Sequence, residues 1–338
     1  MPLSIKIRMT KNRIRSWINQ YGEDDVYVSL SGGKDSSVVF DIVREDYPSV
    51  KGVFINTGLE YPSVSSFAKS QENVDVVNPS KTFVQVLTEY GYPIIGKELA
   101  QRLYEYKPNG YAVKYFDGSK KGDRYDLSRY AYLLDAPFRI SHKCCSIMKK
   151  NCAKKYEKQT GRKPIIATMA EESALRAQKW LHRGCNAFDI DRPKSTPIAF
   201  WTEQDVLQYI YEHNLPIADA YGEVVKDGNK FKTTKCDRTG CVFCLFGIKR
   251  DLWRFARLHE LEPKLYDYVM RGGKFDDDGK WIPSNGLGYW FVCKWLQVHG
   301  NINIELPDYE KYESEYGNEL TEKFLIKGED VDKLYSAK

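Results

Sequence analysis

A short loop, Ser31–Ser37, limits the possible folds of this chain more than any other segment. The loop reads Ser-Gly-Gly-Lys-Asp-Ser-Ser and stands between an apolar, β-branched run at 26–30 and a helical pattern at 37–43. Its adjacent glycines, Gly32 and Gly33, allow a sharp turn and a close approach of the backbone to a ligand. The N–H groups of such a loop and the N-terminus of the next helix together favour an anion. The sequence therefore predicts a phosphate site where a strand turns into a helix.

The side chains of this loop support the same interpretation. Lys34 adds a positive charge, and Ser31, Ser36 and Ser37 add hydroxyl donors. The loop is not a Walker loop, because the G-x-x-x-x-G-K-[ST] spacing is absent. For a Gly-Gly pair alone, a glycine turn that caps a helix is the simpler explanation. The complete heptapeptide in this setting favours the phosphate site.

Strand and helix patterns alternate through the first half of the chain, which predicts an α/β fold with a doubly wound, mainly parallel sheet. Ligands of such sheets lie at the carboxyl ends of the strands. The segment 56–60 follows the second strand pattern and so occupies this position, as does Ser31–Ser37. The strand patterns lie at 26–30, 53–55, 74–77 and 164–169, and the helix patterns at 10–21, 37–43, 61–71 and 82–90.

The later part of the chain changes in character. A helix is expected at 202–213, with Thr202 as its N-cap and Asp205 completing an approximate capping box. Beyond residue 247 the pattern is mostly helical. We therefore expect a domain at 1–247 that carries the site and a mostly helical C-terminal region at 248–338.

Composition sets broad bounds on the class of protein. The 338 residues are 42% apolar and 29% charged, as in soluble globular proteins. No apolar run approaches the roughly 18 residues of a membrane span, and the N-terminus lacks a signal-peptide pattern, so a cytoplasmic protein without a membrane partner is expected. A net charge of +5 is too small to indicate a polyanionic partner by itself. Tyrosines crowd the segment 104–132 among basic residues, either as a base-stacking surface or, more simply, as a loop that packs on the core.

The eight cysteines fall in a pattern that indicates a metal site rather than disulfides. Cys241 and Cys244 form a C-x-x-C pair, and Cys144 and Cys145 are adjacent. Four thiolates in two close pairs suit zinc or a [4Fe–4S] cluster, and the adjacent pair suits the larger cluster better. The cluster is therefore favoured, with zinc and no metal as alternatives. Cys236 is a candidate substitute ligand or a free thiol, whereas Cys152, Cys185 and Cys293 fit ordinary packing roles.

Several motifs resemble those of a known family. The S-G-G-K-D-S loop resembles the PP-loop of the ATP-pyrophosphatase superfamily, whose members split ATP between the α and β phosphates and adenylylate an acceptor. The stretches K-C-C-S-I-M-K at 143–149 and C-V-F-C at 241–244 resemble the paired motifs of cluster-bearing members of the phosphoadenosine phosphosulfate (PAPS) reductase family. The segment 197–206 is similar to that family's P-L-x-x-W-T-x-x-D-V helix entry, and 213–216 to its H-x-L-P exit.

One further stretch, 167–176, resembles the family's G-x-R-x-x-E-S-x-x-R motif but departs from it at two positions. Ala167 replaces the glycine, and Met169 replaces the first arginine, which puts one phosphate or sulfate contact in doubt. By the resemblance, Glu172, Ser173 and Arg176 belong near the nucleotide and its phosphates. On the simpler interpretation, Glu172 and Arg176 form an i,i+4 ion pair on a helix.

The resemblance implies an adenine nucleotide alpha hydrolase-like fold and a site for ATP. Its phosphates would lie on the PP-loop with a Mg²⁺ ion, because the charge that develops on them needs a cation. Lys34, Asp35 and Arg176 would be the catalytic residues. The remaining nucleotide- and phosphate-binding residues would be Ser31, Gly32, Gly33, Ser36, Ser37, Asn56, Thr57, Gly58, Glu60, Glu172 and Ser173.

Three functions fit these motifs. The favoured one is ATP cleavage that adenylylates an acceptor in sulfur transfer, as in the cluster-bearing subunits of DNA phosphorothioation systems and in tRNA thiolation enzymes. DNA or tRNA would then be a partner, and the chain would work as a homodimer or in a multi-subunit complex. The second is a reductase that forms sulfite from adenylyl sulfate or PAPS. It needs a nucleophilic thiolate, but the family's E-C-G-[LI]-H motif is absent and the surroundings of Cys293 do not match it. The third is a nucleic-acid-binding subunit with a degenerate active site.

Overall fold

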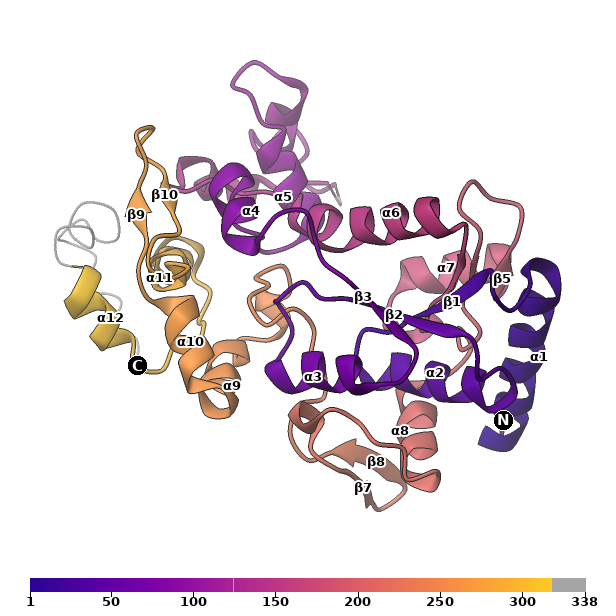
Figure 1. The fold of residues 1–338 in the computed structure, drawn as a ribbon. Helices are drawn as coiled ribbons and strands as arrows, with labels where there is room; N and C mark the ends of the chain where they lie inside the picture. Colours follow the sequence, from indigo (N-terminus) through magenta and orange to yellow (C-terminus); the bar gives the residue numbers. More distant parts are fainter. Residues whose placement is uncertain (124, 318–338) are drawn as a thin grey trace. The chain divides into compact units, whose positions relative to one another are not determined.

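The computed structural model describes residues 1–123 and 125–317 and divides them into two compact units (Figure 1). The first unit comprises Met1–Ser80 and Met148–Cys241, and the second comprises Lys81–Ile147 and the described residues from Val242 onward. This division differs from the predicted boundary at residue 247, which stays a prediction, because 81–147 groups with the C-terminal part. The end of the expected helical region, 318–338, lies outside the described residues.

The first unit is built on a six-stranded sheet with the order β3-β2-β1-β4-β6-β5. Neighbouring strands are parallel except β5, which is antiparallel to β6, so the predicted mainly parallel sheet is confirmed. The strand order reverses direction between β1 and β4, and such a switch point is where ligands bind in open α/β sheets. The strands are β1 (Val26–Ser29), β2 (Lys51–Ile55), β3 (Val74–Val77), β4 (Lys163–Ile165), β5 (Asn186–Ala187) and β6 (Lys194–Ser195).

Helices cover both faces of this sheet, which makes it doubly wound. Because side chains alternate along a strand, Val26 and Val28 join the core cluster formed with α1, α2 and α8. Tyr27 points the other way and packs with Val53 and with Tyr156 of α6. Figure 1 shows α2 and α3 along one side of the strands and α6 along the other. The helices of this unit are α1 (Leu3–Tyr21), α2 (Lys34–Asp46), α3 (Pro62–Ser70), α6 (Asn151–Thr160), α7 (Ala174–Arg183) and α8 (Glu203–Glu212).

A buried polar contact joins the first helix to α8. Asp205 accepts hydrogen bonds from the Thr202 N–H (2.6 Å) and the Thr202 hydroxyl (2.7 Å), which confirms the predicted capping box. Its carboxylate also pairs with Lys6 of α1. Burial disfavours the charged form of Asp205, but the hydrogen bonds from Lys6 and Thr202 hold its pKa below the ordinary value. The start of α8, which faces the carboxyl ends of the strands, is thereby held to α1.

The second unit has a core of aromatic side chains around helix α11. Tyr289 and Trp290 are fully buried there, and the Tyr92 hydroxyl donates to the Leu287 carbonyl (2.8 Å). The region after residue 247 is mostly helical, as expected. The elements of this unit are α4 (Phe83–Tyr90), α5 (Lys97–Tyr104), α9 (Arg254–Leu261), α10 (Pro263–Met270), α11 (Tyr289–Gly300), α12 (Tyr309–Tyr316), β9 (Lys274–Phe275) and β10 (Trp281–Ile282). Within 1–123 and 125–317, no helix has the length and apolar character needed to cross a bilayer.

Short elements complete the chain. The strands β7 (Val224–Asp227) and β8 (Lys230–Thr233) form an antiparallel hairpin that contacts α8. A π-helical turn at Ser146–Lys150 leads directly into α6. The 3-10 turns lie at Tyr111–Tyr115, Ser128–Asp135, Ala170–Glu172, Asp219–Tyr221 and Ile248–Arg250.

Candidate functional site

The loop after β1 has the geometry that its glycines predict. Helix α2 begins at Lys34, and Gly33 is its N-cap residue. Gly32 has a φ of +73°, in the left-handed region that favours glycine. A Cβ at Gly32 would also lie 2.6 Å from the Val64 carbonyl oxygen of α3 and 2.9 Å from Val64 Cγ1. Both the turn and the close packing of α3 on the loop therefore require glycine at this position.

The serine hydroxyls fix the shape of the loop from within. Ser36 and Ser37 are buried, and their hydroxyls donate to the Gly33 carbonyl at 2.8 and 3.1 Å. Ser36 Oγ also accepts from the Ser31 N–H (3.1 Å), while Ser31 Oγ accepts from the Gly33 N–H (3.3 Å). These bonds hold the loop in a defined conformation at the N-terminus of α2, where backbone N–H groups favour an anion.

Lys34 lies buried at the carboxyl edge of the sheet rather than in solvent. Its ammonium is 2.6 Å from Glu203 Oε1 at the start of α8, and it also donates to the Asp237 carbonyl. The Glu203 N–H in turn donates to Glu171 Oε2 (2.7 Å), in the turn that follows β4. Sequence reasoning missed Glu203, because 169 positions separate it from Lys34 and no local pattern links them.

Asp35, the acidic residue of the loop, has a strongly shifted pKa. Its Oδ1 is buried and has no hydrogen-bond partner among the described residues. Burial raises the pKa of Asp35 to about 6; Lys34 opposes this shift, and the carboxylates of Glu172 and Glu203 add to it. A carboxylate oxygen is a ligand type that Mg²⁺ prefers, and the buried Oδ1 of Asp35 has the chemistry to serve as one. Glu172 and Glu203 are paired with Arg176 and Lys34, so the loop offers one candidate Mg²⁺ ligand rather than a preformed set.

The turn that follows β4 carries the residues predicted from the 167–176 motif. Glu172 pairs with Arg176 through an i,i+4 contact, and Glu172 Oε1 also accepts from the Met169 N–H (3.1 Å). Ser173 is the N-cap of α7, and its Oγ accepts from the Arg176 N–H (3.3 Å). Met169, at the position of the family's arginine, is buried in the core cluster of the sheet. The motif thus shapes the β4–α7 turn, and its direct role toward a nucleotide stays a prediction.

The segment after β2 forms a second polar group at this edge. The Thr57 hydroxyl donates to Glu60 Oε1 (2.8 Å), and Asn56 Nδ2 donates to Asn78 Oδ1 (3.1 Å). Gly58 has a φ of +70°, and no atom lies within 4 Å of the position that a Cβ would occupy there. Lys149, which the sequence did not single out, lies 3.3 Å from Glu60 Oε1. Although burial works against it, the charges of Cys241 and Glu60 raise the pKa of Lys149 well above its ordinary value.

The predicted metal ligands fall in both units. Cys241 belongs to the first unit, where Lys149 contacts it, and Cys144, Cys145 and Cys244 belong to the second. In the second unit, burial and then the nearby charges of Tyr92, Cys144, Cys244 and Cys293 raise the pKa of Tyr289, so both predicted ligands and the packing residue Cys293 lie near this hydroxyl. No group of three or more His, Cys, Asp or Glu side chains is placed to hold a metal ion in the described parts of the chain. The cluster, the zinc alternative and the substitute role of Cys236, which is fully buried, stay predictions.

A doubly wound sheet with a glycine loop at its switch point, on the N-terminus of the following helix, defines a class of α/β proteins that carry their ligand site at this loop. The sequence matches the phosphoadenosine phosphosulfate reductase domain over residues 25–106 and 118–245. The chain therefore belongs to the PAPS reductase family, and the family resemblance inferred from its motifs is confirmed.

Known proteins resemble the chain at low identity. An uncharacterized protein of Methanocaldococcus jannaschii is 24% identical over 261 residues, which are 75% of this chain and 49% of that protein. The chain thus spans about half the length of this relative. Among solved structures, the PAPS reductase of Candida auris in a phosphate complex shares 13% identity and a TM-score of 0.37, over 62% of this chain and 82% of that one. The U34-tRNA thiolase of Methanococcus maripaludis, solved with its [4Fe–4S] cluster, shares 12% identity and a TM-score of 0.37, over 79% and 81%.

Proposed function

We propose that this chain is an ATP-pyrophosphatase-type enzyme that binds ATP on the PP-loop and adenylylates an acceptor in sulfur transfer. The observation that carries the proposal is the loop itself. It presents backbone N–H groups at the start of α2, a buried Lys34 and a buried, unpartnered Asp35 oxygen at the switch point of the sheet. Family membership supports adenine nucleotide chemistry at this position.

In the proposed reaction, a nucleophilic atom of the acceptor attacks the α-phosphorus of ATP. A bond forms between the acceptor and the α-phosphorus, the bond to the α–β bridging oxygen breaks, and pyrophosphate leaves with that oxygen and its electron pair. The loop N–H groups and the Lys34 ammonium stabilise the charge that accumulates on the leaving pyrophosphate. For Lys34 to reach the phosphates, its contact with Glu203 must lengthen, so ATP and Glu203 compete for one cation.

The Asp35 carboxylate would contribute one ligand to the Mg²⁺ ion, and the phosphates of ATP would supply others. When bound, this ion neutralises phosphate charge and orients the triphosphate. Asn56, Thr57 and Gly58, at the end of β2, would bound the adenosine, since Gly58 leaves open space there. Arg176, on the neighbouring turn, would contribute a cation toward the phosphates once its pairing with Glu172 loosens.

The proposal includes a [4Fe–4S] cluster held by Cys144, Cys145, Cys241 and Cys244, with zinc as the alternative. Thiolates are the usual ligands of both, and two close pairs of cysteines in the sequence are what support the proposal. When bound, a cluster supplies electrons or carries sulfur. Anaerobically purified protein should be brown and contain about four irons and four acid-labile sulfides per chain. Cys144→Ser should lower the iron content, whereas the buried control Cys293→Ser should not. Purified protein that contains zinc and no iron would refute the cluster.

The state of Cys293 argues against the reductase alternative. This thiol is fully buried in α11, and burial raises its pKa well above the ordinary value. A reductase of this family needs an accessible thiolate as nucleophile, and a buried thiol with a raised pKa supplies little. Cys293 therefore does not provide the thiol that the sequence lacks at the expected motif.

Pyrophosphate release tests the proposed function. Anaerobic protein is incubated with ATP and Mg²⁺ together with DNA, tRNA or sulfate, and pyrophosphate and the adenylylated product are followed. Release should depend on an acceptor and be lost in Lys34→Ala, whereas Lys226→Ala, an exposed lysine of the β7–β8 hairpin, should behave as the parent protein. No pyrophosphate with any acceptor would support the binding-subunit alternative. Sulfite from adenylyl sulfate and thioredoxin would support the reductase.

A further inference from the structure

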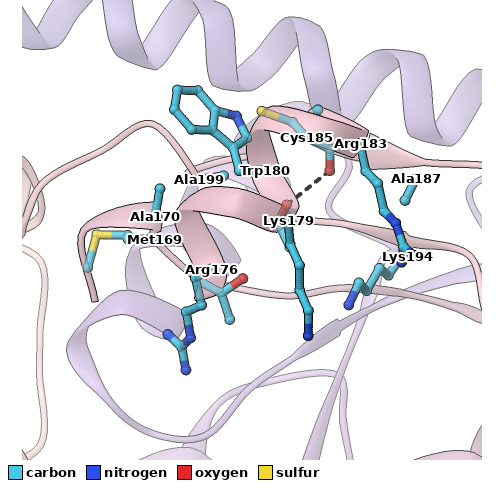
Figure 2. Close-up of a pocket in the computed structure, with 13 residues that line it drawn as sticks. Met169, Ala170, Arg176, Lys179, Trp180, Arg183, Cys185, Ala187, Lys194 and Ala199 are labelled. Atoms are coloured by element: carbon cyan, nitrogen blue, oxygen red, sulfur yellow. Dashed lines mark hydrogen bonds between the residues drawn. The ribbon is translucent and has the colours of Figure 1, made fainter. Parts of the chain in front are cut away.

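A polar pocket lies in the first unit beside helix α7, where the 167–176 motif forms one wall and basic residues outside the motif form the other. Its volume is about 190 Å³, and Figure 2 shows Lys179 and Arg183 extending from α7 toward Lys194 of β6. Residues 176, 179 and 183 recur at the spacing of one helix face. Besides these cations, the lining residues are Thr168, Met169, Ala170, Trp180, Gly184, Cys185, Ala187, Thr196 and Ala199.

The charged side chains that line this pocket are all basic. No carboxylate lines it, and no described carboxylate lies within ion-pair distance of Lys179, Arg183 or Lys194. By contrast, Arg192, close to Lys194 in the chain, is held by two oxygens of Glu157 at 2.5 and 2.6 Å. Burial and the charges of Lys179, Arg183 and Arg192 lower the pKa of Lys194. The fourth lining cation, Arg176, is paired with Glu172. Lys179, Arg183 and Lys194 repel one another, so an anion would stabilise their arrangement.

Helix α7 itself is free of any core-packing role. None of its side chains is buried, and Leu181 is 77% exposed. Among its ten residues, Arg176, Lys179, His182 and Arg183 are basic and none is acidic. A helix with no fully buried side chain, with only basic charge and with the half-buried indole of Trp180 suits a large anionic partner.

We infer that this pocket and the basic face of α7 bind the phosphate backbone of a single-stranded nucleic acid. The pocket is smaller than the roughly 300–1,000 Å³ of sites that enclose a small ligand, so it would take one phosphate group of a longer molecule. Lys179 and Arg183 on the exposed helix would contact this phosphate and its neighbour, and Trp180 would stack on a base. The pocket starts at Thr168 and Met169, after β4, and β4 adjoins the strand that carries the PP-loop. That the bound strand is also the acceptor of the adenylyl group rests on the proposed function.

Oligonucleotide binding without ATP tests this inference. Anisotropy of a fluorescein-labelled single strand of mixed sequence, as DNA and as RNA, is measured over a series of salt concentrations. The double variant Lys179→Ala with Arg183→Ala should bind on the order of tenfold more weakly at physiological salt. Its slope of log K against log salt should be smaller by about 1.4, because each single-strand phosphate contact contributes about 0.7. The matched control, Lys226→Ala with Lys230→Ala, removes two exposed lysines of the β7–β8 hairpin and should leave both quantities unchanged.

Three results would overturn the inference. The first is an unchanged salt slope in the pocket variant, and the second is an equal loss in the hairpin control. The third is binding of inorganic phosphate or ATP that depends on Lys179 and Arg183, without any binding of the oligonucleotide, which would assign the pocket to a free anion. Failure of ATP cleavage is a separate outcome, since Lys34→Ala should lose pyrophosphate release yet retain the oligonucleotide.

Discussion

The close packing of α3 on the PP-loop makes Gly32 the most informative position for a stability experiment. Gly32→Ala introduces a Cβ at a φ of +73°, and this atom would lie 2.6 Å from the Val64 carbonyl oxygen. Gly161→Ala is the matched control. Gly161 follows α6 in the same unit with a φ of +78°, but no atom lies within 4 Å of its would-be Cβ. The two substitutions therefore share the backbone strain and differ in the steric clash.

The expected magnitudes follow from these two contributions. A left-handed φ costs an alanine about 1 to 2 kcal/mol relative to glycine, so Gly161→Ala should lower the free energy of unfolding by about that amount. Forcing an extra carbon into a packed site costs a further 1 to 3 kcal/mol or so. The contact at Gly32 is with helical backbone, which cannot rotate away as a side chain would. Gly32→Ala should therefore cost about 2 to 5 kcal/mol.

Urea denaturation, followed by fluorescence and circular dichroism, measures both losses. With a total stability of about 5 to 15 kcal/mol, both variants should remain folded in buffer. Gly32→Ala should also bind ATP more weakly, because the loop or α3 must move to admit the methyl group, whereas Gly161→Ala should bind as the parent does. Equal losses of stability in the two variants would refute the argument that packing against Val64, beyond backbone conformation, requires glycine in this loop.

Two further predictions concern buried carboxylates. In the presence of a chelator, Asp35→Asn should be more stable than the parent protein at pH 7. The pKa of Asp35 in the folded protein is about 6, above the ordinary 3.8, so the stability of the parent protein falls as pH rises between these values. Thermal unfolding should therefore show no difference in stability between variant and parent below about pH 4, and a difference of at most about 3 kcal/mol above pH 6. Asp205→Ala removes a helix cap and the buried partner of Lys6, and it should lower the free energy of unfolding in urea by about 3 kcal/mol. This loss should shrink as pH falls below the ordinary pKa of an aspartate, because the pKa of Asp205 is depressed in the folded protein. Asp227→Ala, which breaks the exposed pair with Lys232, should leave the midpoint nearly unchanged, and a similar loss there would contradict the role of burial.

The parts of the fold that could be predicted are those set by neighbouring residues. The β1–loop–α2 unit is indicated by a β-branched run, two glycines and a helical period within 26–43, and the structure confirms it. The Thr202–Asp205 capping box is equally local. Helix α1, by contrast, begins at Leu3, ahead of the predicted start at residue 10, because Lys6 gains its partner only when α8 packs beside it.

Contacts between distant segments could not be predicted in the same way. Glu203 and Lys149 reach the site from α8 and from the turn before α6, and neither stands in a pattern that names its partner. The grouping of 81–147 with the residues after 242 depends on packing such as the ring contact between Phe83 and Phe243. One bridge, Ile94 with Leu245, joins the same two segments. Periodicity within either segment contains no information about such pairing.

Met169 and Asp35 bear differently on the alternative of a subunit with a degenerate active site. Met169 is accommodated in the core, so this position no longer supplies a cation. Asp35, however, keeps a buried oxygen without a partner among the described residues, which destabilises the folded chain at neutral pH. A chain without catalytic function would gain stability from an amide or an apolar residue there. The Asp35 carboxylate, beside Lys34 on an intact loop, is therefore better explained by the proposed phosphate site than by the stability of the fold.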